Sequence, residues 1–185
     1  MEKIFISGSM KIKNLHSSFK DRLREAIADG YEFLVGDASG SDTSIQEFLL
    51  SCGSPTVTVY CAGPVPRNNV GNWPVNNVYP SAPEGTRSFF TAKDIQMAED
   101  SSSGIMIWDS ASTGTLSNVF ELTSRGKKSE VFVNKLKRFI PVNGAEDIAA
   151  LISVMSPGAY QKADQKIGIR KKMDKLNSSQ LGFGF

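Results

Sequence analysis

Short apolar runs alternate with helical patterns along most of this chain, and this alternation restricts the fold more than any other feature. The runs that we expect to form strands are residues 3–6, 31–35, 56–61, 105–108 and 131–133. After the first run, Leu15, Phe19, Leu23 and Ile27 recur at every fourth position, which is typical of an amphipathic helix. Strands that alternate with helices form parallel crossovers. The sequence therefore predicts an α/β fold, a three-layer sandwich with a mainly parallel, five-stranded sheet and helices on both faces.

Length and composition favour one globular domain followed by a basic segment. The 185 residues are 40% hydrophobic and 22% charged, as is ordinary for a folded domain with its own core. We expect residues 1–158 to form a Rossmann-like domain that ends in a helix over 146–155. Residues 159–185 are expected to form a basic tail, a helix with a frayed end. Residues 62–83 are rich in Pro, Asn and Gly and too long for a simple connection, so we expect a lid or a poorly ordered excursion there.

The charge and the few Cys and His residues argue against several classes of protein. The formal net charge is +2, too small for a fold that binds DNA or a membrane through its overall charge. Cys52, Cys61 and His16 are too few for a disulfide framework or a metal site, so we expect reduced thiols, no metal and no cofactor. The first residues lack the pattern of a secretory signal, and no apolar run approaches the roughly 20 residues of a membrane span. We therefore expect a cytoplasmic protein without a membrane partner.

Three of the expected strands end in turns rich in Gly, Ser, Thr and Asp. In an open parallel sheet, the carboxyl ends of the strands border the crevice in which ligands bind. Small residues let backbone amides approach an anion closely, and a helix that begins at such a turn favours a phosphate. The turn residues that we expect to bind a ligand are Ser7, Gly8, Ser9, Gly36, Asp37, Gly40, Asp42, Ser112, Gly114 and Thr115.

Each of these turns, taken alone, also has a purely structural explanation. Turns from strand to helix use Gly for its conformational freedom and Ser, Thr or Asp as helix caps, and Asp42 is one candidate cap. Three such turns on crossovers of one sheet favour a ligand site. The sequence contains neither a GxGxxG dinucleotide motif nor a GxxxxGK[ST] phosphate loop. With His16 as the only histidine, a Ser-His-Asp triad is not expected either.

Aromatic and basic residues add further candidates. Trp73, in the long 62–83 segment, is expected to contact the ligand or a partner surface. Trp108 has two equally weighted interpretations, stacking on a base or packing in the core beside its strand. Arg67, Arg87 and Lys93 are candidates for phosphate contacts, but solvated surface charges are the more common role of such residues.

Six short motifs occur in an order that resembles the SLOG superfamily, over about residues 3–133. The motifs are Ile-Ser-Gly-Ser (6–9), Val-Gly-Asp-Ala-Ser-Gly-Ser-Asp (35–42), Lys-Asp-Ile-Gln-Met-Ala (93–98), Ile-Met-Ile-Trp-Asp (105–109), Ser-Thr-Gly-Thr (112–115) and Gly-Lys-Lys (126–128). SLOG proteins are Rossmann-like nucleotide sensors akin to the cytokinin-activating LOG phosphoribohydrolases and the nucleoside 2-deoxyribosyltransferases. The resemblance implies a nucleotide or nucleotide derivative bound by the Gly-rich turns.

The chain departs from the hydrolase pattern of this superfamily. LOG-type hydrolases show Pro-Gly-Gly-x-Gly-Thr-x-x-Glu, but Ala111-Ser112-Thr113 replaces the lead and Asn118 takes the place of the Glu. Met10 stands where many relatives have Arg. An N-glycosidase needs a carboxylate that stabilises the developing sugar cation, and Asn cannot serve. The carboxylates that remain as candidates are Asp37, Asp42, Asp109 and Glu121, with Asp37, Asp109 and Glu121 as the expected catalytic residues of an enzyme.

Three functions stay open at this point. The first is a nucleotide-binding sensor or carrier without chemistry of its own, which the missing Glu favours. The second is an N-glycosidase or deoxyribosyltransferase that acts on a nucleoside or nucleotide. The third is an interaction with nucleic acid through the basic tail, against which the near-neutral domain argues. A nucleotide-derived ligand is the expected partner, a homo-oligomer remains open, and nucleic acid is not expected.

Overall fold

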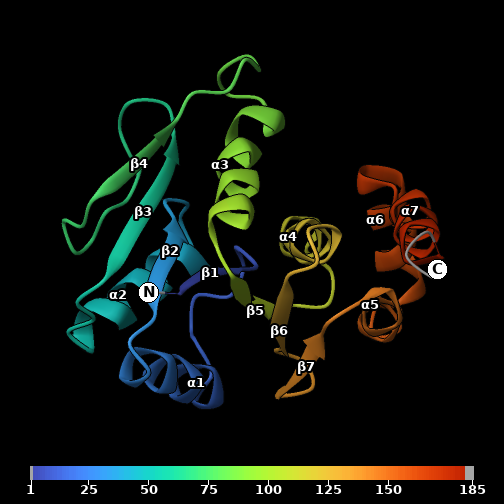
Figure 1. Cartoon of the computed structure of the whole chain (residues 1–185), viewed down its shortest axis with the longest axis horizontal. Helices are drawn as coiled ribbons and strands as arrows, with labels where there is room; N and C mark the ends of the chain where they lie inside the picture. The colour runs from blue at the N-terminus through green and yellow to red at the C-terminus, as the bar shows by residue number, and fades with distance from the viewer. Residues whose placement is uncertain (1, 182–185) are drawn as a thin grey trace.

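The computed structural model describes residues 2–181 and shows a Rossmann-like α/β sandwich, as the sequence predicts (Figure 1). Within these residues the sheet has seven strands in the order β4-β3-β2-β1-β5-β6-β7. The strands are β1 (Lys3–Gly8), β2 (Glu32–Gly36), β3 (Val57–Ala62), β4 (Val75–Val78), β5 (Ser103–Trp108), β6 (Lys128–Val133) and β7 (Arg138–Val142). All neighbours pair in parallel except β6 and β7.

Helices cover both faces of the sheet. The helices are α1 (Ser17–Ala28), α2 (Ser41–Ser51), α3 (Arg87–Asp100), α4 (Thr113–Ser124), α5 (Ala145–Ile152), α6 (Pro157–Ile167) and α7 (Ile169–Leu181). Side chains alternate along each strand, so in β1 Ile4 and Ile6 pack toward α1 and α2, and Phe5 packs toward α3 and α4. Two apolar layers, one on each face, therefore hold the sandwich together.

The first helix shows how local sequence sets an element's limits. His16 accepts a hydrogen bond from the Ser18 amide at 3.2 Å and caps the amino end of α1. Gly30, with φ +79°, lies just beyond the other end, where the left-handed conformation suits glycine. Phe19 and Leu23 of the predicted stripe are fully buried. The only histidine of the chain therefore has a structural place, stacked on Phe132 with ring centroids 5.2 Å apart.

All five predicted strands are present, but the sheet has two strands more than expected. Strand β4 lies inside the 62–83 segment, where it pairs in parallel with β3. The segment is therefore partly an edge strand, and the prediction of a lid or a poorly ordered excursion was wrong for that part. Strand β7 follows a tight turn and pairs antiparallel with β6, with Pro141 on the outer edge strand where its missing N–H is tolerated.

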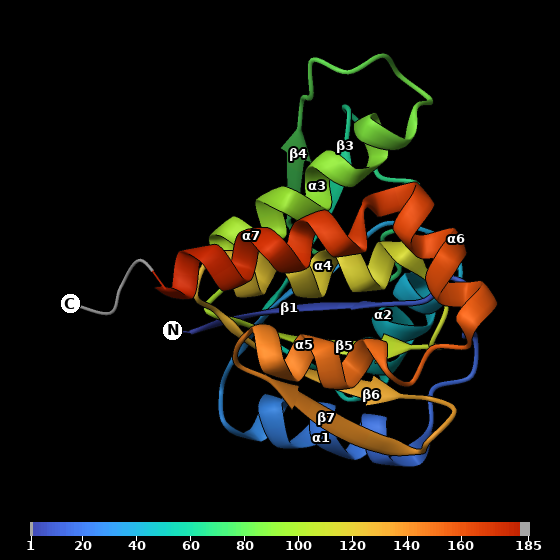
Figure 2. The ribbon, with the colours of Figure 1, turned by 90° about the vertical axis from the view of Figure 1, so that its right-hand side faces the viewer.

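The reversed strand β7 brings the end of the chain back to the site. Strand β7 runs toward the amino edge of the sheet, so α5 runs back toward the carboxyl edge and α6 begins there. Helices α6 and α7 then lie against α4 and α5 (Figure 2). Ala163 and Ile169 are buried in the same core as Trp108. The basic segment is thus packed on the domain through two helices; the predicted frayed end over residues 182–185 lies outside the described residues.

The order of the strands reverses between β1 and β5. The chain builds β1 to β4 outward in one direction and then crosses back through α3 to place β5 on the other side of β1. At such a reversal the loops after the two strands turn to opposite faces and leave a crevice at the carboxyl edge. The first and third predicted turns, which follow β1 and β5, meet at this crevice.

Candidate functional site

A cleft of about 1050 Å³ opens at the carboxyl ends of β1 and β5. Its floor is formed by the turns after these strands and by the start of α4, and its walls come from α3 and from α6. Basic side chains of both walls line it, Arg87 and Lys93 from α3 and Lys162 and Lys166 from α6. The cleft therefore coincides with the crevice expected from the strand order.

Hydrogen bonds join the β1 turn to the β5 turn. The Ser9 hydroxyl is fully buried, lies 3.3 Å from Thr115 Oγ1 and accepts a hydrogen bond from the Asp109 amide at 3.0 Å. Ser7 lines the cleft and accepts a hydrogen bond from Asn118 Nδ2 at 3.0 Å. Ser9 thus fixes the two turns to each other, and Ser7 faces the cleft. Asn118, where the hydrolase pattern has Glu, also lines the cleft.

The first turn of α4 offers backbone donors to the cleft. Ser112 is the N-cap, but its side chain makes no capping hydrogen bond. Ser112, Thr113, Gly114 and Thr115 all line the cleft. The first amides of a helix have no partner within the helix, and the helix dipole adds partial positive charge at this end. This end of the cleft is therefore suited to an anion.

Gly114 differs from the other predicted glycines of the site. A Cβ on Gly114 would meet only the Ser112 hydroxyl, 4.0 Å away. A Cβ on Gly8 would lie 2.4 Å from Ile107 Cγ2, and one on Gly36 would lie 2.4 Å from Asp42 Oδ2. Gly40, with φ +84°, would meet the Met10 carbonyl oxygen at 2.2 Å. The fold itself requires the other three glycines, whereas at Gly114 the space is open.

A buried lysine in the middle of α3 lies between two carboxylates. Lys93 is 4% exposed, and its Nζ lies 2.7 Å from Asp94 Oδ1 and 3.9 Å from Asp42 Oδ2. Burial lowers the pKa of Lys93, but the two carboxylates outweigh it and leave the pKa above its ordinary value. Burial raises the pKa of Asp42 to about 6 against the attraction of Lys93. The interpretation of Lys93 as a solvated surface charge was wrong, because Gly36 leaves room for its ammonium group.

Asp37, a candidate for both binding and catalysis, forms a second ion pair, with Arg67. Its side chain is 2% exposed and receives hydrogen bonds from the Arg67 amide, Nε and Nη2 at 3.0, 3.0 and 2.6 Å. Burial alone would raise the pKa of Asp37, but the hydrogen bonds from Arg67 keep it below its ordinary value. Arg67, not Asp37, lines the cleft, and its guanidinium carbon lies 4.6 Å from the centre of the Phe90 ring.

The other two catalytic candidates are not alike in position. Asp109 lines the cleft, and its Oδ1 accepts hydrogen bonds from the amides of Ala111 and Ser112 at 3.0 and 2.7 Å. Ser110, the residue after Asp109, has φ +66°. This left-handed conformation costs a non-glycine residue about 1–3 kcal/mol. Glu121 lies one turn farther along α4, pairs with Arg125 and is not among the cleft residues. Of the three carboxylates, the structure places only Asp109 in the cleft wall.

The two tryptophans lie outside the cleft. Trp108 is fully buried, and its Nε1 donates to the Ser112 carbonyl oxygen at 3.0 Å, so its packing role in the core is the correct interpretation. Trp73 packs beside Gly71 on the side of the core that faces α1 and α2. The Trp73 amide donates a hydrogen bond to Asn69 Oδ1, and the Trp73 carbonyl oxygen accepts one from Asn69 Nδ2. Its predicted contact with a cleft ligand has no support in this position.

Two lysines of α6 are cleft residues that the sequence analysis did not predict. Lys162 and Lys166 line the cleft from the side opposite α3. Their spacing of four residues, after the helix start at Ser156 and Pro157, was the available signal. The wall that they form depends on the return of the chain through β7 and α5, which local sequence patterns do not show.

The cleft carries more positive than negative side chains. The residues that line it include six cations, Lys11, Arg67, Arg87, Lys93, Lys162 and Lys166, and three carboxylates, Asp42, Asp94 and Asp109. Lys93 and Arg67 each form an ion pair with a carboxylate, Lys93 with Asp94 and Arg67 with Asp37. Arg87 Nη2 lies 3.4 Å from the Thr113 hydroxyl. Within residues 2–181, Lys11, Lys162 and Lys166 form no ion pair. An anionic ligand would therefore meet free cations here.

Residues 2–181 contain no cluster of three His, Cys, Asp or Glu side chains placed to hold a metal ion. Over the same residues, no helix is both long and apolar enough to cross a bilayer. Comparison of the sequence with known protein families gives no match, and comparison with curated proteins gives none. Any assignment of function therefore depends on the cleft itself.

Proposed function

We propose that the cleft binds a nucleotide or a nucleotide-derived small molecule, and that the protein acts as a sensor or carrier of this ligand. One phosphate would lie at the start of α4, where the amides of Thr113 and Gly114 and the dipole of the helix favour negative charge. The open space at Gly114 carries the proposal. Within a helix, a glycine lowers helix stability relative to alanine by up to about 1 kcal/mol. The atoms around Gly114 leave room for a side chain and do not require a glycine. The close approach of an anion to the backbone would explain why a glycine is present.

The surroundings of this position support the same class of ligand. Lys11 and Arg87 add positive charge to the cleft, and the Phe90 ring with the Arg67 guanidinium above it offers a flat surface for a base. The resemblance to the SLOG superfamily implies the same class of ligand, a nucleotide held by the Gly-rich turns.

The proposal is tested by thermal unfolding in the presence of nucleoside monophosphates, nucleotide sugars, cyclic nucleotides and the corresponding nucleosides. A ligand present at one hundred times its Kd stabilises the folded state by about 2.7 kcal/mol. We expect phosphorylated compounds to raise the Tm and nucleosides to have little effect. Absence of a shift with every phosphorylated compound would contradict the proposal.

A second candidate function is hydrolysis or transfer at an N-glycosidic bond. Its support is the position of Asp109 in the wall of the cleft, next to the start of α4. In hydrolysis the bond between the anomeric carbon and the base nitrogen breaks, a water oxygen bonds to that carbon, and the leaving base takes up a proton. A carboxylate beside the sugar stabilises the positive charge that develops on it. Release of free base from nucleoside monophosphates, followed by chromatography, distinguishes this function from binding alone.

A further inference from the structure

Helix α6 presents two lysines to the cleft in an arrangement that is unfavourable without an anion. Lys162 and Lys166 are one helical turn apart and both line the cleft. Like charges at this spacing repel each other on a helix surface. Asp164, the carboxylate between them in sequence, pairs instead with Arg170, at 3.3 Å. The two lysines are therefore not neutralised by their own helix.

The opposite wall does not neutralise these lysines either. Arg87 and Lys11 add further positive charge to the cleft, while Asp42 and Asp94 are used by the buried Lys93. Within residues 2–181 no carboxylate forms an ion pair with Lys162 or Lys166. The third carboxylate of the cleft, Asp109, accepts hydrogen bonds from backbone amides and pairs with neither lysine. An excess of positive charge in a cleft concentrates anions, so this arrangement favours a ligand with more than one negative group.

The core fixes the position of the α6 wall. Ala163, between the two lysines, is fully buried in the core that also contains Leu116 and Phe120 of α4. Gly158 and Ala159, one turn before Lys162, also line the cleft and leave space beside the lysines. The volume of about 1050 Å³ lies just above the roughly 300–1000 Å³ range of pockets for small ligands. Both charge and space therefore extend beyond what one phosphate group needs.

We propose that Lys162 and Lys166 form a second anion subsite and that the ligand carries two phosphate groups separated by a nucleoside, as in a 5′-phosphorylated dinucleotide. One phosphate lies at the start of α4, and the other lies between the two lysines. This inference rests on the proposed function, since it names the chemical class of the ligand in the same cleft. It depends on α6, which lies beyond the residues that resemble the SLOG superfamily.

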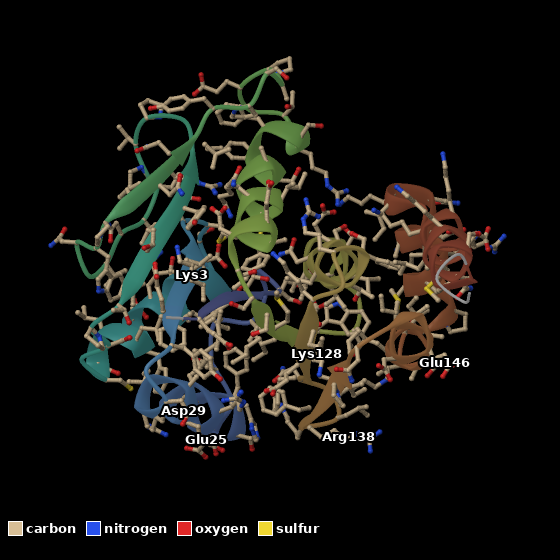
Figure 3. All side chains as sticks on the ribbon, in the orientation of Figure 1. Lys3, Glu25, Asp29, Lys128, Arg138 and Glu146 are labelled. Atoms are coloured by element: carbon tan, nitrogen blue, oxygen red, sulfur yellow. The ribbon has the colours of Figure 1, made fainter. Side chains whose placement is uncertain are left out.

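The test compares probes with one and with two phosphates. Isothermal titration calorimetry measures the Kd of nucleoside monophosphates and of 5′-phosphorylated dinucleotides, with each of the four bases, on the wild-type chain and on Lys162→Gln/Lys166→Gln. The control variant, Lys128→Gln/Lys171→Gln, removes the same charge from exposed lysines outside the cleft. Lys128 lies at the amino end of β6, at the sheet edge opposite the cleft (Figure 3).

We expect the best dinucleotide to bind the wild-type chain at least tenfold more tightly than its mononucleotide. The α6 variant should lose this advantage, because hydrogen bonds to charged groups contribute about a factor of ten or more each. Its Kd for the mononucleotide and its Tm without ligand should stay close to wild type, and the control variant should keep the full advantage. Equal loss in both variants, or a dinucleotide advantage that survives in the α6 variant, would overturn the second subsite. Failure of the wild-type chain to bind any of these probes would also overturn the second subsite, and the thermal-unfolding panel described above would then decide the proposed function separately.

Discussion

Replacement of Arg67 by Met should expose how much the buried Asp37 carboxylate depends on its partner. Asp37 is held by two side-chain hydrogen bonds from Arg67 and by the amide of residue 67, which remains in any variant. Met keeps the length and the apolar part of the side chain and can still contact the Phe90 ring. The variant therefore removes the positive charge with little loss of packing.

The magnitude follows from the exposure of the two partners. Breaking a buried ion pair from one side destabilises a protein by about 3–5 kcal/mol. The Asp37 side chain is 2% exposed but that of Arg67 is 42% exposed. Since water reaches the arginine side of the pair, we expect the lower end of the range, about 3 kcal/mol. For a chain of this size that corresponds to a Tm lower by about 6–12 °C.

The pH dependence of this loss has a definite sign. In the wild-type protein the pKa of Asp37 is lowered, so its stabilising contribution is present above its unfolded pKa and is lost as the pH falls through its folded pKa. In Arg67→Met the amide of residue 67 and the attraction of Lys93 still favour the ionised carboxyl, but the side-chain hydrogen bonds that oppose burial are lost, so the folded pKa of Asp37 should rise relative to wild type. The difference in Tm between wild type and variant should therefore widen as the pH rises from about 3.5 to 7.

Thermal unfolding followed by circular dichroism at several pH values measures this difference. The matched control is Arg22→Met, which breaks the ion pair between Arg22 and Glu130. In this pair Arg22 Nε lies 2.6 Å from Glu130 Oε2. The Glu130 side chain is 41% exposed, and exposed pairs contribute about 0–1 kcal/mol. Similar Tm losses in the two variants, or a difference for Arg67→Met that does not change with pH, would show that Asp37 does not depend on Arg67 in this way.

Three further predictions concern the cleft. Gly114→Val should abolish nucleotide binding measured by calorimetry while the circular dichroism spectrum stays native. The control Ser124→Val, on the same helix outside the cleft, should bind normally. Global unfolding of Gly114→Val would show that the fold requires this glycine. The unfolding free energy of the wild type relative to Asp42→Asn should fall by up to about 3 kcal/mol between pH 4 and 7, because the pKa of Asp42 is raised to about 6 and its ionisation is unfavourable in the folded state; urea titrations that show no such fall would contradict this. If base release is detected, Asp109→Asn should reduce its rate by about 10² to 10⁴ with binding retained, and an unchanged rate would remove Asp109 from that role.

The parallel part of the fold was predictable because each strand carries its own signal. The runs before Gly8, Gly36 and Asp109 are apolar on both faces, as buried parallel strands are, and polar turns mark where they end. Strands β4 and β7 have no such signal. The sequence of β4 is Val-Asn-Asn-Val, and asparagine is a poor strand former, so its pairing with β3 decides the conformation. Strand β7 contains a proline and is tolerated only because it lies at an edge.

The candidate site was predictable where it follows the backbone and less so where it depends on side chains from distant elements. Gly114 and Ser7 lie in the cleft, as expected from turns at the carboxyl edge. Asp37 was expected to face a ligand, yet a partner 30 residues later in the chain occupies its carboxylate. Trp73 was expected to contact the ligand or a partner surface from a lid or a poorly ordered excursion, but β4 joins that segment to the sheet. Whether a charge is paired or free is set by tertiary neighbours, which no local pattern contains.

Strand β7, the one reversed strand within residues 2–181, affects how proteins of this architecture can diverge. Because α5 runs toward the carboxyl edge, opposite in direction to α4, it delivers the chain to the open side of the cleft, and the 11 residues of α6 become its outer wall. Substitutions that are far apart and share no partners have additive effects. If the cleft binds the proposed ligand, inherited changes in α6 would therefore alter which ligand is accepted while the turns of β1 and β5 stay as they are. Under selection for a new ligand, the substitutions would then be concentrated in α6.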